Sequence, residues 1–319
     1  MPDDFFSIND EMKENFFKAY GVIGLEITSK VQGKMYTGSK ADPLCRYCGR
    51  DNTSTTFKNE SHAISVFLGN RTLIDWNECD SCNKHFGSFV EDHFAKYTLP
   101  HRAFSRTKGR VKIPSYKDKD YEVVAGDSGN LKISMLRASD LGDILVEGPE
   151  RSTLKFSMQR QPYRPTAVYK TFVKMALALM PDEDHKSLGA LKQWILADNH
   201  ETLFSGDVKV IEWQIPGPMN PNRLLCYICK AKPEFEAAHF KYILLVAFGN
   251  HQFQVVIPDP VYEAGINKKF LFAPALMPTK HFQKYGAPNF TERSFFSSEI
   301  VKGEKVEIVI STDSLTERE

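Results

Sequence analysis

Two pairs of cysteines have the residue type and spacing of a metal site. Cys45 and Cys48 form one Cys-x2-Cys pair, and Cys79 and Cys82 form a second pair further along the chain. Two residues between the cysteines let both thiolates face one ion from a single tight turn, and two such turns complete a tetrahedral site. Gly49 suits the left-handed turn of the first pair. The spacing therefore predicts one structural Zn²⁺ held by the four cysteines.

Polar side chains that can bind a cation or transfer a proton lie close to these cysteines in the sequence. Glu60 and His62 lie between the two pairs, and Asn83 and His85 follow the second pair. An imidazole has an ordinary pKa of about 6.5, so it exchanges protons at neutral pH. The segment between the pairs is longer than in an ordinary zinc ribbon, and we expect it to carry a further function.

This stretch resembles the HNH nuclease family, in particular bacterial members with two zinc knuckles. In that family a His and an apolar pair follow the first knuckle, then a turn that contains Gly, and the second knuckle is followed directly by Asn or His. The matching residues are Cys45-x2-Cys48, His62-Ala63-Ile64, Gly69-Asn70 and Cys79-x2-Cys82-Asn83. The resemblance covers about residues 44–100, and the segments 91–97 and 169–176 are also similar to full-length members.

The resemblance implies a ββα-metal finger, in which a two-stranded ribbon presents the His and a helix after the second knuckle presents a metal ligand. By position, His62 would be the general base that activates a water against the scissile phosphodiester. Asn83 would bind the catalytic ion, Mg²⁺ or Mn²⁺, since oxygen and imidazole ligands together favour these ions over a second zinc. The family's middle Asn, which steadies the base, corresponds to Asn77 or Asn70, of which we favour Asn77.

The residue before the predicted base departs from the family pattern. Many members have Asp, Glu or His at this position, whereas this chain has Ser61. Glu60 shares a strand face with His62, and we expect it to enter the catalytic metal site. His85, two residues after Asn83, is the alternative ligand. Ser61 also leaves open a second interpretation, in which the domain binds DNA without cutting it.

Residues 96–120 are rich in Lys and Arg and are predicted to be a connecting arm. Lys and Arg side chains supply most of the sequence-independent affinity for phosphates. The residues expected to bind DNA are Arg102, Arg106, Lys108 and Arg110. Tyr97, Phe104 and Tyr116 are interleaved with them, and we expect these rings to pack against sugars or bases. A solvated linker is the alternative interpretation.

Two further clusters are predicted to be structural. Cys226 and Cys229 repeat the Cys-x2-Cys spacing inside an apolar run without a turn-forming residue, so we expect two buried thiols. The acidic residues 182–184 precede His185 and resemble a metal cluster. Acidic side chains in the first turn of a helix complement the helix dipole, and we therefore expect a helix to start there.

Periodicity and turn signals predict a mixture of helices and strands. A first helix is expected to end near Lys18, before a strand over residues 22–31. Two later helices are expected, from Pro165 to about Met180 and from residue 182 to about Ala197. Further strands are expected at 121–125, 131–136, 153–158, 208–214, 223–229, 241–248, 252–257 and 305–311.

The composition is that of a globular protein, with 42% apolar and 25% charged residues, and it excludes disordered and collagen-like chains. The net charge of +1 gives no indication of a nucleic-acid partner. No apolar run approaches the roughly 20 residues that cross a bilayer, and the first residues lack the pattern of a signal peptide. Cysteines spaced for metal rather than disulfides favour a reducing compartment. We expect a cytoplasmic protein without a membrane partner.

We predict an α+β fold in three parts. A leader of residues 1–44 precedes a zinc-stabilised HNH domain at 45–110, with the basic arm to about 120, and a mixed sheet-and-helix domain follows at 121–319. The predicted function is a metal-dependent endonuclease that hydrolyses DNA, with a role in restriction or phage defence that rests on the resemblance alone. The last part is expected to recognise a target, form a homo-oligomer or bind a regulatory partner. The alternatives are a zinc-dependent nucleic-acid-binding module without catalysis and a protein-interaction adaptor.

Overall fold

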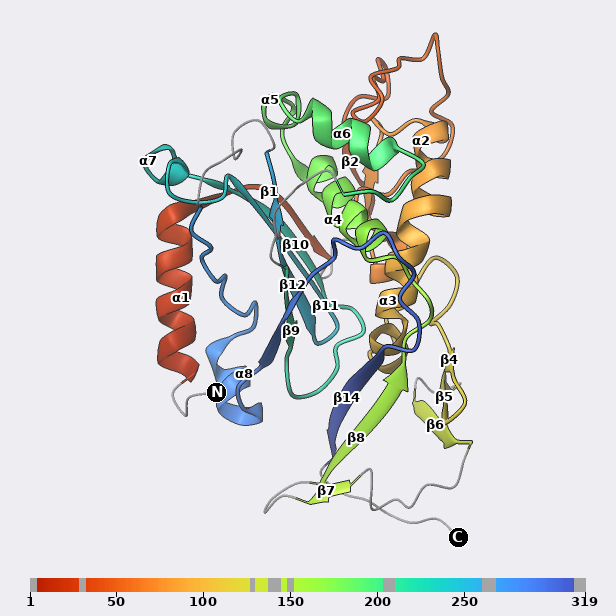
Figure 1. Cartoon of the computed structure of the whole chain (residues 1–319), viewed down its shortest axis with the longest axis vertical. Helices are drawn as coiled ribbons and strands as arrows, with labels where there is room; N and C mark the ends of the chain where they lie inside the picture. Colours follow the sequence, from red (N-terminus) through yellow and green to blue (C-terminus); the bar gives the residue numbers. More distant parts are fainter. Residues whose placement is uncertain are drawn as a thin grey trace.

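The computed structural model describes residues 5–28, 33–126, 130–136, 145–147, 152–202, 210–259 and 268–312 (Figure 1). The helices are α1 Phe5–Ala19, α2 Asp80–His85, α3 Glu91–Phe104, α4 Pro165–Leu179, α5 Asp182–His185, α6 Gly189–Leu196, α7 Pro233–Glu236 and α8 Thr279–Tyr285. The strands are β1 Tyr20–Thr28, β2 Met35–Thr37, β3 Leu73–Asp75, β4 Tyr116–Lys117, β5 Tyr121–Ala125, β6 Leu131–Met135, β7 Leu145–Glu147, β8 Ser152–Gln159, β9 Val210–Gln214, β10 Leu224–Ala231, β11 Tyr242–Phe248, β12 His251–Ile257, β13 Asn289–Arg293 and β14 Lys305–Thr312.

A six-stranded antiparallel sheet forms the centre of the molecule, in the order β1-β10-β11-β12-β9-β13. Helices α1 and α4 lie on opposite sides of this sheet (Figure 1). Every residue of β11 and β12 is buried. Burial on both faces explains why β11 is a continuous apolar run rather than an alternating one.

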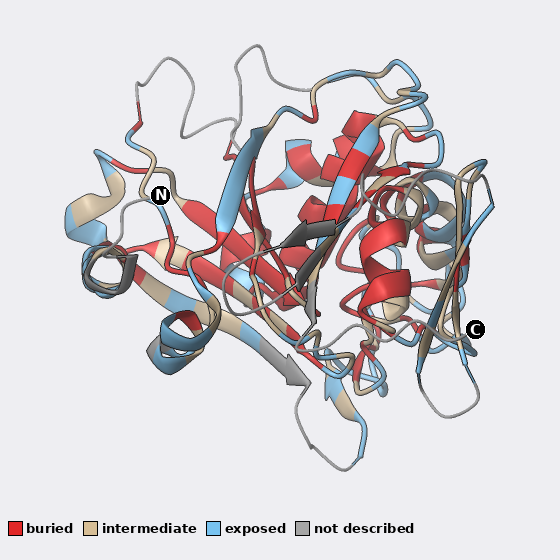
Figure 2. Ribbon diagram, turned by 90° about the horizontal axis from the view of Figure 1, so that it is seen from below, coloured by how far each residue is buried: buried red, intermediate tan, exposed pale blue. Residues whose placement is uncertain are grey.

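Helix α4 is buried along its whole length, from Pro165 to Leu179. Pro165 occupies the first turn, where its missing N–H costs nothing and its fixed φ favours the helix. The helix lies between the central sheet and the segment that carries the two cysteine pairs, and it contacts β1, β10, β12 and α3. In Figure 2 the strands at the centre of the molecule are coloured mainly as buried, and the outer segments are coloured largely as exposed or intermediate. Helix α4 is therefore the element through which the cysteine segment packs onto the sheet.

Three smaller sheets complete the described part of the chain. Strands β2 and β3 pair in parallel beside the cysteine segment, β4-β5-β6 form an antiparallel sheet, and β14-β8-β7 form another. The last two share a second hydrophobic cluster with the end of α3. No helix in the described ranges is long and apolar enough to span a membrane.

The observed elements confirm the predicted α+β fold class, with the cysteine cluster in the N-terminal part. The predicted helix from Pro165 is α4, and the predicted strands of the sheet match β1 and β9 to β12 within a few residues. The second predicted helix is interrupted, because α5 ends at His185 and α6 begins at Gly189. The division into residues 1–44, 45–120 and 121–319 remains a prediction, although one core cluster contains Phe16, Phe86 and Phe253 together.

The predicted connecting arm is wrong for its first part, because residues 91–104 form helix α3. Tyr97, Phe104 and Tyr116 are each at most 1% exposed. Their rings pack inside the protein, so they are not available to stack on sugars or bases. The apolar side chains between the basic ones are the buried side of a helix and of the strand pair that follows it.

Candidate zinc and nuclease site

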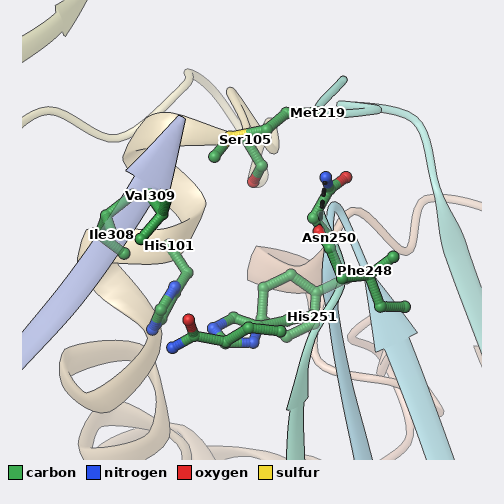
Figure 3. A pocket seen from close by; sticks show the side chains of 10 residues that line it. His101, Ser105, Met219, Phe248, Asn250, His251, Ile308 and Val309 are labelled. Atoms are coloured by element: carbon green, nitrogen blue, oxygen red, sulfur yellow. Dashed lines mark hydrogen bonds between the residues drawn. The ribbon is translucent and has the colours of Figure 1, made fainter. Parts of the chain in front are cut away.

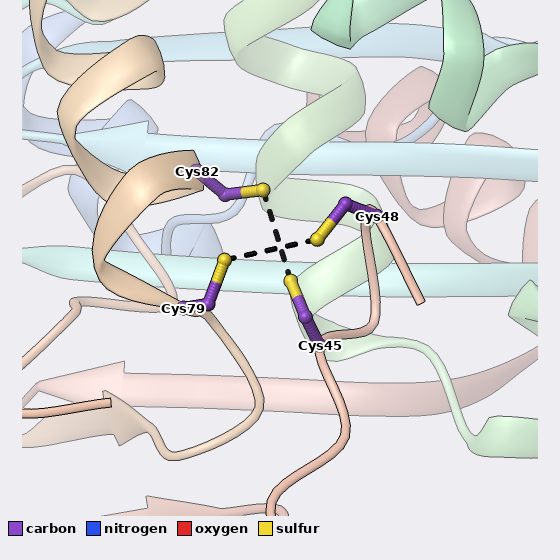
Figure 4. A group of neighbouring side chains, drawn as sticks. All are labelled: Cys45, Cys48, Cys79 and Cys82. Carbon is purple, nitrogen blue, oxygen red and sulfur yellow. Dashed lines mark hydrogen bonds between the residues drawn. The ribbon is translucent and has the colours of Figure 1, made fainter. Parts of the chain in front are cut away.

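The four cysteines meet in the arrangement that a zinc ion requires (Figure 4). The Sγ atoms of Cys45 and Cys82 are 3.8 Å apart, and those of Cys48 and Cys79 are 3.7 Å apart. Four sulfurs bound tetrahedrally to one Zn²⁺ at about 2.3 Å lie about 3.8 Å from one another. The donor set and its geometry therefore fit a structural zinc, as the cysteine spacing predicted.

Local contacts hold the thiolates in place. The Gly49 amide donates to the Cys45 carbonyl at 2.8 Å, and its φ of 71° is the left-handed conformation that glycine adopts without strain. The Arg50 guanidinium donates to Cys48 Sγ at 3.3 Å, which places a cation beside the thiolates. Cys79 caps the N-terminus of α2, so the second pair spans the start of the helix. These contacts come from residues adjacent to the ligands in the sequence.

A short antiparallel ribbon presents His62 next to this zinc centre. The Asp75 amide donates to the Ser61 carbonyl at 2.8 Å, and the Ala63 amide donates to the Leu73 carbonyl at 3.2 Å. His62 itself pairs with Ile74. The ribbon is followed by α2, which gives the order strand, strand, helix that the resemblance implied.

Asn70 fixes the turn of this ribbon. Its Nδ2 donates to the carbonyls of Ile64 and Leu73, at 2.9 and 3.1 Å, and its Oδ1 accepts from the Leu73 amide at 3.0 Å. The side chain is fully buried. Asn77, by contrast, accepts a hydrogen bond from the Ser39 amide through Oδ1. The contacts that support the strand of His62 are therefore those of Asn70, and the role of Asn77 in steadying the base remains a prediction.

The imidazole of His62 is partly buried and neutral at pH 7. Its Nδ1 is buried and has no hydrogen-bond partner. Burial, assisted by the cations Lys174 and Arg110, lowers the pKa of His62 to about 4. A neutral imidazole can accept a proton, as a general base must, but a pKa of about 4 makes it a weaker base than an imidazole of ordinary pKa.

A buried ammonium lies beside His62 and was not predicted. Lys174, on α4, donates to the His62 carbonyl at 2.6 Å, and its Nζ lies 3.2 Å from Glu78 and 3.6 Å from Glu91. Burial alone lowers the pKa of Lys174, but the two carboxylates raise it above its ordinary value, so it stays charged. Glu91 also accepts a hydrogen bond from Ser65 at 2.5 Å. The similarity of segments 91–97 and 169–176 to the family was the only sequence signal for this contact.

A second buried ion pair joins α4 to the cysteine segment. Arg46 Nε lies 2.8 Å from Asp75 Oδ2, and both side chains are almost fully buried. The same guanidinium donates to the Leu177 carbonyl at 3.0 Å, near the C-terminal end of α4, where a cation is favourable. Buried charged groups therefore link α4 to both strands of the ribbon, through Lys174 at His62 and through Arg46 at Asp75.

The predicted ligands of a catalytic ion point in different directions. Glu60 forms an ion pair with Lys34. His85, on α2, has Nε2 3.1 Å from the Ile195 carbonyl and its ring stacked on Phe89. Among the described residues, Glu60, His62 and His85 do not form a group whose ligand atoms lie within 4.8 Å of one another. Asn83 lies within α2 and is half-buried. The assignment of these residues to a catalytic ion remains a prediction.

The predicted DNA-binding cations differ in exposure. Arg102 is only 6% exposed, donates to Thr98 and to the Ala95 carbonyl, and lies over the Phe67 ring. It therefore does not fit the prediction, because its guanidinium is used inside the protein. Lys108 and Arg110 are exposed and Arg106 is half-buried. Arg110 is also close enough to His62 to lower the pKa of that imidazole.

The structural roles predicted for two other clusters agree with their surroundings. Cys226 and Cys229 are buried thiols in β10. Asp184 accepts hydrogen bonds from Tyr242 and Lys230, and His185 pairs with Asp182 at 3.0 Å.

Comparison with known proteins identifies one part of the chain. Residues 45–99 match the family model of the HNH endonuclease. No curated protein matches the chain. No solved structure matches it either. The family supports a nuclease-type function and implies a nucleic-acid substrate. Together with the cysteine cluster and its two knuckles, the match shows that residues 45–99 are an HNH endonuclease domain.

Proposed function

We propose that the protein is a metal-dependent endonuclease that hydrolyses phosphodiester bonds of DNA, with His62 as the general base. The observation that carries this proposal is the neutral imidazole of His62, with Nδ1 unpartnered, on the ribbon that precedes α2 within the matched domain. His62 takes the proton of an attacking water, and the water oxygen adds to phosphorus as the bond to the leaving oxygen breaks. Asn70 and Lys174 hold the strand that carries this ring.

The zinc ion is structural in this proposal. A closed site with four thiolates leaves no position for substrate, so the zinc contributes stability and not catalysis. Removing it would release the start of α2 and the ribbon that precedes it, because Cys79 directly precedes that helix and Cys82 lies within its first turn. We propose that its role is to hold His62 and the first turns of α2 in fixed positions.

We propose, on the resemblance to the family, that catalysis also needs a second cation, Mg²⁺ or Mn²⁺. Such an ion supplies positive charge beside the scissile phosphate. The residues described around His62 do not present a converged set of oxygen and imidazole ligands, so no step is assigned to the ion here. Lys174 and Arg110 already place positive charge near the ring.

The surface for the nucleic acid is proposed to include Lys108 and Arg110. Both are exposed, and they follow α3 directly. Their charge would contribute sequence-independent affinity for the phosphate backbone. A role in restriction or phage defence, and a partner or second copy bound through residues 121–319, are proposed on the resemblance alone.

A plasmid assay tests the proposal. Supercoiled plasmid is incubated with the purified chain in Mg²⁺ or Mn²⁺, and wild type is compared with His62→Ala. We expect nicking by wild type and a loss of about 10²–10⁴-fold in the variant, the range for a general base. His239→Ala is the matched control, because His239 lies after α7, which ends at Glu236, and is outside the matched domain. Equal nicking by wild type and His62→Ala would refute the assignment of the base.

A specific observation favours a second candidate, a zinc-dependent DNA-binding module without catalysis. Ser61 stands where many family members have an acidic residue, and Ser61 is fully buried with its hydroxyl donating to the Glu78 carbonyl. The same preparation distinguishes the two functions. DNA binding in a mobility-shift assay, with no nicking in Mg²⁺, Mn²⁺ or Zn²⁺, would favour the binding module.

A further inference from the structure

A second group of metal-ligand side chains lies outside the HNH domain. His101 from α3, Glu212 from β9 and His251 from β12 bring one ligand atom each within 4.8 Å of the others. Their exposed fractions are 8%, 2% and 3%. Figure 3 shows the imidazoles of His101 and His251 approaching each other from the helix and from the sheet. The three residues are far apart in the sequence and meet only because α3 packs against the sheet.

Hydrogen bonding fixes the tautomer of His251. Its Nδ1 lies 3.0 Å from the Trp213 carbonyl, which can only accept, so Nδ1 carries the proton. In the neutral ring, Nε2 therefore presents a lone pair. This Nε2 lies 3.9 Å from Glu212 Oε1, and neither atom has a hydrogen-bond partner. A guanidinium nitrogen of Arg160 lies 3.6 Å from Glu212 Oε1, which is beyond hydrogen-bond distance. Buried acceptors without a hydrogen bond are unfavourable, and a metal ion between the two atoms would satisfy both.

His101 adds a third unpartnered atom at the same place. Its Nε2 is buried without a hydrogen bond, and its ring centre lies 3.5 Å from that of His251. Burial, and then the neighbouring His251, hold the pKa of His101 well below its ordinary value. Burial likewise lowers the pKa of His251 to about 4. Both rings are therefore neutral at pH 7, which is the form that binds metal ions.

The carboxylate of Glu212 is oriented by its other oxygen. Oε2 accepts from Tyr97 and from Arg293, both at 2.7 Å, which leaves Oε1 facing the histidines. Hydrogen-bonded partners of this kind fix the orientation of a metal ligand.

Three guanidinium groups face this cluster, those of Arg160, Arg223 and Arg293, and each lowers the pKa of His251. Arg160 lies 3.6 Å from Glu212 Oε1 and 3.2 Å from Glu304, and Arg293 lies 3.3 Å from Glu304. Glu304 and the ligand Glu212 offset two of these charges. The remaining positive charge weakens the affinity of the cluster for a cation, so the ligand atoms must supply the binding energy.

We propose that His101, Glu212 and His251 form a binding site for a divalent first-row transition-metal ion, separate from both the zinc knuckles and His62. Two imidazole nitrogens and one carboxylate oxygen are a ligand set for Zn²⁺, Fe²⁺ or Mn²⁺. Bonds of about 2.1 Å to a tetrahedral ion would place the His251 and Glu212 atoms about 3.4 Å apart. The observed 3.9 Å therefore needs a closure of about half an ångström. The same bonds place two imidazole ring centres roughly 5 Å apart, so the rings of His101 and His251, which are 3.5 Å apart, must separate by roughly 1.5 Å when the ion binds.

The site opens into a cavity, so a fourth position is accessible. Polar side chains of Ser105, Gln214 and Asn250 line this cavity together with His101 and His251. The space available to the centre of a water molecule is about 40 Å³, more than the roughly 15 Å³ that one water needs. Three protein ligands with an open position are typical of a site that binds water or a small ligand rather than a closed structural site.

Cobalt titration of the full chain tests this site. The protein is first loaded with one equivalent of Zn²⁺, which the four thiolates hold, and Co²⁺ is then added. We expect a second metal equivalent with visible d–d absorption and without the thiolate-to-cobalt charge-transfer band. His251→Gln and His101→Gln should each weaken this binding by more than about 100-fold, because changes even to groups around a ligand cost 10–100-fold. His239→Gln is the control and should bind like wild type.

The outcomes distinguish this site from any ion beside His62. An ion bound there would be retained in both variants, and its binding would depend on His62 instead. If wild type binds only one metal, or if the second equivalent persists unchanged in His101→Gln, the proposal is refuted. His101 lies near the C-terminal end of α3 and can be replaced without removing a hydrogen bond described here. That variant decides the question if His251→Gln does not fold.

Discussion

The zinc centre and the buried histidine cluster are assembled in opposite ways. The zinc centre takes its ligands from two short turns, each with its own backbone and side-chain support. The histidine cluster takes His101, Glu212 and His251 from a helix and two strands of the central sheet. The zinc centre is expected to persist as long as its four ligands are present. The histidine cluster is expected to persist only as long as α3 stays packed against the sheet. The two centres should therefore respond to different substitutions.

Replacing one zinc ligand should have the largest effect. Cys82→Ser leaves three thiolates, and structural zinc in small domains contributes an apparent free energy on the order of 10 kcal/mol to folding. We expect loss of zinc by elemental analysis and rapid proteolysis within residues 45–99. Cys229→Ser is the control, because Cys229 is a buried thiol of β10. Retention of a full equivalent of zinc in Cys82→Ser would contradict the claim that zinc binding depends on all four cysteines.

Removing the buried ammonium of Lys174, which contacts the strand of His62, should have the next largest effect. Lys174→Met leaves Glu78 buried without its ion-pair partner. Burial raises the pKa of Glu78 to about 8, so its carboxyl group can take up a proton at pH 7, and we expect a loss in the free energy of unfolding below the roughly 3–5 kcal/mol of a buried charge left unpaired. Chemical denaturation measures this change. The double variant Glu78→Gln, Lys174→Met should recover part of the loss, because the buried carboxyl group of Glu78 is then absent and only the less buried Glu91 loses an ion pair. Equal stability of wild type and Lys174→Met would show that α4 does not depend on this contact.

The pH profile of cleavage should reflect the burial of His62. The base works in its deprotonated form, so activity is lost as pH falls through its pKa. Burial lowers that pKa from 6.5 to about 4, and a nearby metal ion would lower it further. We expect nicking rates to be nearly constant from pH 8 to about 5.5, after correction for DNA binding. A tenfold loss already between pH 7 and 5.5 would indicate an exposed base with an ordinary pKa.

The smallest effect is expected in the salt dependence of DNA affinity. This measurement tests whether Lys108 and Arg110, rather than Arg102, contact the phosphates. Replacing both Lys108 and Arg110 by Ala should reduce the slope of log affinity against log salt by about 2, at about 0.9 per phosphate contact. Arg102→Ala is the matched control, because Arg102 is buried. It should lower stability and leave the slope unchanged. A reduced slope in Arg102→Ala alone would restore the original prediction for that residue.

Sequence reasoning succeeded where the signal is local. The spacing of the four cysteines, the apolar run of β11 and Pro165 at the start of α4 each depend on neighbouring residues. The residues that pack around His62 from elsewhere were missed. Lys174 lies more than one hundred positions after His62, and no spacing rule relates them.

The errors have a physical cause as well. Arg102 was expected to bind DNA from a connecting arm, but its guanidinium finds hydrogen-bond acceptors and a ring inside the protein. Long cationic side chains can bury their stems and satisfy their heads in this way. The cluster of His101, Glu212 and His251 was not predicted, because its three residues become neighbours only after β9, β12 and α3 have packed.

Rescue of a truncated base by a small molecule tests the central claim most directly. His62→Gly should lose nicking activity by about 10²–10⁴-fold, and imidazole added to the buffer should restore part of it with a dependence on neutral imidazole concentration. The variant His239→Gly, measured at the same imidazole concentrations, is the control for general effects of the additive. Restored cleavage would support His62 as the proton acceptor. Unimpaired cleavage by His62→Gly without imidazole would contradict the account.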